Sequence, residues 1–201
     1  MKKIFGIFLL ILIMQSCGNK TNTTIRGTLN NGEKEYIYLD YLNINSTETI
    51  DLIKINKKGE FTFDLFLEHP DIYILRNNEG KIITLLPHPE EDVYVEGDYN
   101  YFNDSYSVSG SEESEYIRRL VEKLQDTRER LKELDESYSQ LSNVNQEQAS
   151  SYINRRKAII QEQRDFTIHF IIEHLNSIAS IYAIYQKISP GQYVLNQNTD
   201  I

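Results

Sequence analysis

The chain has 201 residues, which is enough for one domain or two small ones. It carries 30 acidic against 21 basic residues and shows no basic stripe, which argues against binding to a nucleic-acid backbone. Fourteen tyrosines and no tryptophan indicate a β-rich portion, because aromatic side chains suit pleated surfaces.

The chain begins with a basic segment followed by an apolar run. Two lysines, Lys2 and Lys3, precede residues 4–14, which are apolar apart from Gly6. At about 1.5 Å of rise per residue, this run is too short to cross a hydrocarbon core of roughly 30 Å. The order of charge and apolar run predicts a signal peptide over residues 1–16.

The single cysteine, Cys17, lies where the apolar run ends, in the segment IMQSCGNK (13–20). This segment resembles a bacterial lipoprotein signal: Ser16 is the small residue expected before the cysteine, whereas Gln15 departs from the usual pattern. The resemblance implies that the Cys17 thiol is joined to a diacylglyceryl group and that cleavage leaves Cys17 as an acylated amino terminus. The alternative is an ordinary signal peptide that happens to contain a cysteine.

Lipidation of Cys17 would determine where the protein is located. Each acyl methylene buried in a bilayer contributes about 0.8 kcal/mol, so several chains on one residue anchor a protein without a membrane-spanning helix. Residues 17–24 then form a polar tether. Gly18 replaces the aspartate that often retains lipoproteins at an inner membrane. The resemblance therefore implies a lipid-anchored protein of the cell envelope, in the outer membrane and facing the periplasm.

The next part of the chain alternates polar and apolar residues with a period of two. Turn sequences such as 56–59 (NKKG) and 77–80 (NNEG) separate short runs, and Gly59 supplies the positive φ that a hairpin loop needs. Strands this short, at intervals of about ten residues, predict an antiparallel β-sandwich or open barrel over residues 25–110.

Beyond Gly110 the period becomes helical, so the fold class is α+β. Ser111 is a candidate N-cap, followed by acidic residues that suit the positive end of a helix dipole. A heptad pattern of apolar residues follows, with Thr127 at one step: Ile117, Leu120, Leu124, Leu131, Leu134, Tyr138 and Leu141. A second helix is expected over 146–175 and a shorter third helix after an Asn176-Ser177 cap.

The two long helices should pair as an antiparallel hairpin within a helical region over residues 111–188. The alternative partner for the heptad stripe is a second copy of the chain, which would give a homodimer through the hairpin. Residues 189–201 read as an open, polar C-terminal tail with no strand or helix that closes the fold.

Several clusters of polar residues were weighed as sites and set aside. His88 lies near Glu90, Glu91 and Asp92, but adjacent residues of a strand cannot all point at one ion. His69 precedes a proline in a turn and is interpreted as strand punctuation. His169 and His174 are five residues apart, which does not place them on one helix face as a zinc pair requires. The basic run 155–157 is interpreted as a solvated helix face. We therefore predict no catalytic, cofactor-binding or metal-binding residue, and no cofactor.

The order of segments resembles a known family. The most telling pieces are the segments 58–61 (KGEF), 97–98 (GD) and 108–111 (VSGS), each short but in the right order. Together with the helices they look like the N-terminal domain of unknown function, with its helical extension, of thioredoxin-like thiol–disulfide oxidoreductase lipoproteins of Gram-negative bacteria. The family carries a Cys-x-x-Cys pair in a following thioredoxin-like domain, and this chain has no such pair.

We therefore expect a lipid-anchored, non-catalytic module and not an enzyme in the chain as given. The open tail favours the front part of a longer oxidoreductase, and a stand-alone relative is the other possibility. The resemblance implies a membrane as one partner and a thioredoxin-like domain or envelope protein as another. A rival hypothesis is an envelope binding module that takes a glycan or peptide on exposed tyrosines.

Overall fold

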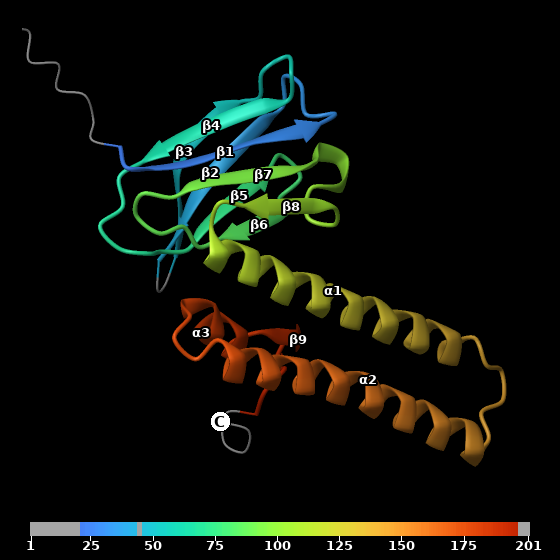
Figure 1. Ribbon diagram of the computed structural model, residues 1–201. Coiled ribbons are helices and arrows are strands. Elements are labelled where there is room, and N and C mark those ends of the chain that lie inside the picture. Colours follow the sequence, from blue (N-terminus) through green and yellow to red (C-terminus); the bar gives the residue numbers. More distant parts are fainter. Residues whose placement is uncertain (1–20, 44–45, 197–201) are drawn as a thin grey trace, which may run out of the picture.

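The computed structural model describes residues 21–43 and 46–196. A β-sandwich comes first in the chain, and a pair of long helices extends from it (Figure 1). The described strands of the sandwich have the following bounds: β1 Thr23–Asn30, β2 Tyr36–Leu42, β3 Thr47–Lys54, β4 Glu60–Leu65, β5 Tyr73–Asn77, β6 Ile82–Leu85, β7 Asp92–Asp98 and β8 Tyr106–Ser109. A short 3₁₀ turn, Tyr99–Tyr101, connects β7 to β8.

These strands form two separate four-stranded sheets and not a closed barrel. The β1 sheet has the order β4-β1-β7-β8, and the β2 sheet has the order β3-β2-β5-β6. The predicted sandwich is thus confirmed, with one departure: β1 pairs in parallel with β7, with Ile25 opposite Val93. Between β1 and β7 the chain passes through β2 to β6, which belong to both sheets, and so long a connection permits the parallel direction that a hairpin forbids.

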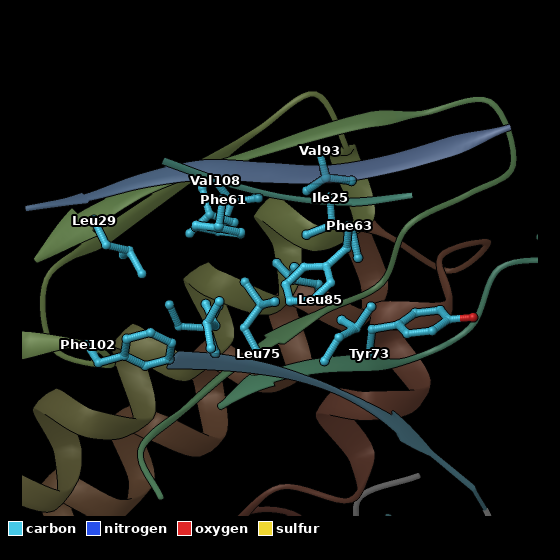
Figure 2. Packing of buried hydrophobic residues seen from close by; sticks show 14 of the residues in the cluster. Ile25, Leu29, Phe61, Phe63, Tyr73, Leu75, Leu85, Val93, Phe102 and Val108 are labelled. Carbon is cyan, nitrogen blue, oxygen red and sulfur yellow. The ribbon is translucent and has the colours of Figure 1, made fainter. Parts of the chain in front are cut away.

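The core of the sandwich lies between the two sheets. Alternate residues of β1 point inward, and its core residues Ile25 and Leu29 are fully buried. Figure 2 shows Phe61, Phe63 and Val93 on one side facing Leu75 and Leu85 on the other. Two turns depend on glycine: Gly59 has φ 79° and Gly110 has φ 80°, a region that side chains with a Cβ rarely adopt. The positive φ expected at Gly59 is confirmed.

The helical region contains α1 (Glu112–Ser139), α2 (Gln146–Glu173) and α3 (Ile178–Ile184). Ser111 caps α1 by accepting a hydrogen bond from the Ser114 N–H, as predicted. The predicted stripe faces inward from Ile117 to Leu134 and is buried, including Thr127. At its end the prediction was wrong for Leu141, which is 41% exposed because α1 has already ended at Ser139.

The stripe of α1 packs against α2 of the same chain. Inside the pair, the Thr127 hydroxyl donates to Gln163 Oε1 at 2.7 Å, and Gln163 Nε2 donates to the Thr167 hydroxyl at 3.2 Å. On the exposed side, Glu162 accepts hydrogen bonds from Arg130 and Lys123, and these bonds lower the pKa of Glu162 to about 2. The antiparallel hairpin predicted from the sequence is therefore present within one chain.

A single carboxylate fastens α3 to α1. Glu113 accepts hydrogen bonds from the Ser177 hydroxyl at 2.7 Å and from the backbone N–H groups of Ile178 and Ala179 at 3.2 and 2.9 Å. The first N–H groups of a helix have no partner within the helix, so this carboxylate caps α3 from outside. Ser177 also caps α3, as predicted.

The expected open tail is wrong for its first residues. A short hairpin, β9 (Lys187–Ser189) and β10 (Gln192–Tyr193), follows α3 and turns at Pro190-Gly191. Val194 and Leu195 are then 3% and 1% exposed, in one cluster with Leu124 and Leu131 of α1. Short strands held by tertiary packing leave no periodic signal in the sequence.

No helix in the described ranges is long and apolar enough to cross a membrane.

Candidate functional site

A cleft of about 640 Å³ lies between the β2 sheet and the helices. The outer face of the sheet provides one wall, and α1 with α3 provides the other. The lining residues are Leu42, Ile72, Ile82 and Thr84 from the sheet; Asn103; Val121, Leu124, Gln125 and Arg128 from α1; and Ile178, Ile181, Tyr182, Tyr185, Gln186 and Lys187 from α3 and the start of β9. This volume is within the range of about 300–1,000 Å³ that is usual for ligand sites.

The local structure explains why this wall is apolar. In β6, Ile83 and Leu85 point into the sandwich core, so Ile82 and Thr84 point outward. Burial raises the pKa of the Tyr182 phenol, and its hydrogen bond with Thr84 works in the opposite direction. Tyr182 of α3 thus reaches the outer face of β6, which joins the two walls at the floor of the cleft.

Large apolar side chains remain exposed around the cleft. Leu42 is 36%, Ile82 46%, Ile181 57% and Tyr185 61% exposed. They come from both walls and line the same cleft, so they are grouped and not scattered singly over the surface. Clustered apolar surface of this kind marks interaction sites more often than isolated exposed residues do.

Two side-chain amides in the lining have polar atoms without a partner. Gln186 is 5% exposed, and neither its Nε2 nor its Oε1 has a hydrogen-bond partner in the described part of the chain. Asn103 Oδ1 is likewise buried and unpaired, although its backbone carbonyl accepts a hydrogen bond from Gln125. Most buried polar groups are paired, so these atoms are unusual: Gln186 brings an unpaired amide nitrogen and oxygen to the lining, and Asn103 brings an unpaired oxygen. Asn103 also lines a second hollow beside β7 and β8.

The charge of the cleft is opposite to that of the whole protein. The formal net charge is −9, yet the charged residues in the lining are Arg128 and Lys187. Arg128 donates to the backbone carbonyls of Ile188 and Lys187 at 3.0 and 2.6 Å, which fixes the guanidinium at the end of the cleft. Lys187 Nζ lies 4.7 Å from the centre of the Tyr193 ring.

A second hollow, of about 480 Å³, lies beside β7, β8 and α1, and its lining is mainly polar and acidic. Glu96, Asp98, Asp104 and Glu122 contribute carboxylates to it. In the described ranges, no group of three or more His, Cys, Asp or Glu side chains is arranged to hold a metal ion.

The candidate site residues named from the sequence do not come together at one site. Asp92 pairs with Arg26 at 2.5 Å, and Glu91 accepts a hydrogen bond from the His88 backbone N–H at 2.8 Å. His169 lies 3.1 Å from Glu173 on the surface of α2, while the His174 ring packs 4.1 Å from the Tyr116 ring centre. The prediction at Cys17 lies outside the described residues.

No periodic pattern in the sequence locates the cleft. Outward-facing apolar residues such as Leu42 and Ile82 look the same in a sequence as strand residues covered by a neighbour, so periodicity cannot distinguish them. A partial signal lies in the short helix 178–184, where four of the seven residues are Ile or Tyr.

Comparison with known proteins supports the expected N-terminal domain of unknown function. Residues 23–116 match a family described as "Domain of unknown function (DUF4369)". This span contains the whole sandwich and is slightly less than half of the chain. The match runs from the start of β1 into the first turn of α1, so the matched span contributes the sheet wall of the cleft, and most of the helical wall lies beyond it.

The other comparisons add little. No curated protein matches the chain. A solved structure titled "NMR structure of the protein from Eubacterium rectale" is 16% identical, covers 45% of this chain and 88% of its own, and has a TM-score of 0.24.

Proposed function

We propose that this protein is a lipid-anchored component of the cell envelope. Its DUF4369 domain and helices would act as a non-catalytic module, like the one that precedes the thioredoxin-like domain in thiol–disulfide oxidoreductase lipoproteins. The observation that carries the proposal is the lone Cys17 at the end of the apolar run, directly before a polar tether.

The short tether would keep the sandwich near the bilayer. β1 begins at Thr23, so only residues 18–22 separate it from Cys17. A fully extended chain covers at most about 3.6 Å per residue, which limits the distance from the acylated residue to β1 to roughly 20 Å. The module would then hold any attached or bound domain at a short distance from the membrane surface.

A non-catalytic role agrees with the cysteine content. Thiol–disulfide exchange needs an attacking thiolate and a second thiol that resolves the mixed disulfide. The chain has one cysteine, and acylation would consume it. The redox chemistry would then come from a thioredoxin-like domain that this module positions, either in the same polypeptide or in a partner.

The test of the anchor is the substitution Cys17→Ala in the full chain. We expect the variant to lose incorporation of a palmitate analogue and to move from the membrane fraction to the soluble fraction. Ser16→Ala is the matched control, because alanine is also accepted before a lipidated cysteine, and it should keep both properties. A Cys17→Ala protein that stays entirely with membranes would refute the anchor.

The thioredoxin-like relation has its own test. Sequencing the genomic DNA downstream of codon 201 in all frames shows whether a Cys-x-x-Cys domain follows. If none does, affinity capture of the full chain should recover a thioredoxin-like envelope protein. Absence of both results would count against the positioning role while leaving the anchor untouched.

A further inference from the structure

We propose that the cleft between the β2 sheet and α1/α3 binds an extended peptide segment with apolar side chains and one acidic group. This inference goes beyond the proposed envelope role and does not depend on it. It rests on three independent observations: the apolar walls, the unpaired amides of Asn103 and Gln186, and the positive charge of the lining.

The walls define the shape of the ligand. Ile82 faces the cleft from the sheet, and Ile181 and Tyr185 face it from α3, all about half exposed or more. A ligand that covers them removes this apolar surface from water, at about 25 cal/mol for each Å². A segment with several consecutive apolar side chains would fill a volume of about 640 Å³ between two walls.

The amides indicate a peptide rather than a hydrocarbon. Gln186 has an unpaired donor and an unpaired acceptor, and Asn103 has an unpaired acceptor. A peptide unit carries one N–H and one C=O, so its backbone complements this set. A fatty acyl chain would fit the apolar walls but would leave all three polar atoms unpaired, which is costly in a buried site.

The charged residues of the lining favour a ligand that carries a negative charge. Arg128 and Lys187 both line the cleft, and Arg128 donates to the Lys187 backbone carbonyl at the start of β9. The rest of the acidic protein would repel an anion, so a local pair of cations gives an acidic side chain or a C-terminal carboxylate a defined position. A basic peptide would meet like charges in the same place.

The test uses fluorescently labelled hexapeptides, N-acetylated, with five apolar residues and a C-terminal aspartate. Binding is followed by fluorescence polarisation on the full chain. If the chain fractionates with membranes it is reconstituted in lipid nanodiscs, and otherwise it is studied in detergent-free buffer, so failure of the anchor does not affect this measurement. We expect saturable binding, and binding at least about tenfold weaker when lysine amide replaces the aspartate.

Matched variants locate the binding to the cleft. Ile181→Glu should abolish binding, whereas Ile172→Glu, at a residue of α2 that is 62% exposed and outside the cleft, should not change it. Lys187→Glu should reverse the preference for the acidic peptide, whereas Lys57→Glu, in the turn between β3 and β4, should preserve it.

Gln186→Leu separates a binding role from a structural one. Its amide makes no hydrogen bond among the described residues, so we expect the urea midpoint to stay the same or rise while peptide affinity falls about tenfold. Loss of stability without loss of affinity would mean that Gln186 supports the fold and would overturn its assigned role.

Two further outcomes would overturn the proposal. One is the absence of saturable binding by any acidic apolar peptide. The other is tight binding of sodium laurate that Ile181→Glu abolishes while the peptides fail to bind, which would identify a lipid site.

Discussion

At the scale of single residues, the outer face of the β2 sheet carries an ion pair that is largely shielded from water. Asp40 is 2% exposed and accepts hydrogen bonds from Arg76 Nε at 2.6 Å and from the Thr49 hydroxyl at 2.6 Å. The Arg76 guanidinium also lies 4.3 Å from the centre of the Tyr38 ring. Three strands are thereby joined on the face that continues into the cleft.

Asp40→Ala is expected to lower the free energy of unfolding by about 2–3 kcal/mol, because it leaves the Arg76 charge without its buried partner. Urea denaturation measures the loss. Asp92→Ala is the matched control: it removes the same kind of pair with Arg26 on the other sheet, but both side chains there are about half exposed. A loss as large in the control as in Asp40→Ala would refute the importance of burial.

The contribution of Asp40 should depend on pH. Burial alone would raise the pKa of Asp40, but the hydrogen bonds from Arg76 and Thr49 outweigh it and hold the pKa below its ordinary value of 3.8. A carboxyl whose pKa is lowered by folding stabilises the protein above its ordinary pKa, and this stabilisation is lost as the pH falls through the folded-state pKa. The difference in unfolding free energy between wild type and Asp40→Ala should therefore be constant above about pH 5 and shrink below about pH 4. A difference that grows on acidification would contradict this assignment.

At the scale of elements, the helices are placed by a few polar contacts in otherwise apolar packing. Glu113 of α1 caps α3, and the layer of Thr127, Gln163 and Thr167 fixes α1 against α2. Apolar stripes allow neighbouring registers, whereas a hydrogen-bonded layer is satisfied in one register only. The orientation of α3, and with it one wall of the cleft, depends on these contacts.

Glu113→Ala should loosen α3 without unfolding the sandwich. The substitution removes the acceptor for three hydrogen bonds at the α3 N-terminus. We expect amide hydrogen exchange in residues 178–184 to rise at least about tenfold, since a lost cap typically costs about 1 kcal/mol or more. Glu115→Ala, exposed in the same turn of α1, should leave exchange in α3 unchanged.

The polar layer between α1 and α2 predicts a specific double-mutant result. Gln163→Leu leaves the buried Thr127 hydroxyl without its acceptor and should lower the unfolding free energy by about 1–2 kcal/mol. Adding Thr127→Val should restore most of that loss, because both partners are then apolar. Urea denaturation of the single and double variants provides the comparison, and additive losses would show that the two side chains do not act as a pair.

The elements that could be predicted from the sequence are those with local signals. The Ser111 cap, the stripe from Ile117 to Leu134 and the turn at Gly59 each follow from residues a few positions apart. The parallel pairing of β1 with β7 and the strand β9 depend on packing between distant segments, so no local pattern reveals them. The cleft combines both kinds: its residues lie mostly on predicted elements, but α3 is held against α1 by Glu113, a contact between distant segments.

At the scale of the whole molecule, the apolar core of the sandwich and the apolar clusters of the helices are joined at the start of α1. The sandwich core and the helical clusters are joined where the Leu86 backbone N–H donates to the Ser114 hydroxyl at 2.9 Å and the Leu86 carbonyl accepts from Ser111. The start of α1 is thus fixed to the end of β6, and the rest of the hairpin extends away from the sandwich (Figure 1).

The segment after β9 packs against α1 and stabilises the helical region. Val194 and Leu195 lie against Leu124 and Leu131 of α1, and Arg128 holds the backbone of β9. Leu195→Ala should therefore lower the unfolding free energy by about 2–4 kcal/mol, the usual cost of emptying a buried leucine site. Leu175→Ala, at a position 73% exposed, is the matched control and should change it by less than about 0.5 kcal/mol.

Urea denaturation combined with hydrogen exchange gives both the size and the place of the effect, since the loss of protection should centre on residues 124–131 and leave β1 and β7 protected. Equal loss of protection throughout the sandwich would mean that the sandwich and the helical region unfold as one unit and that the C-terminal segment stabilises the whole molecule.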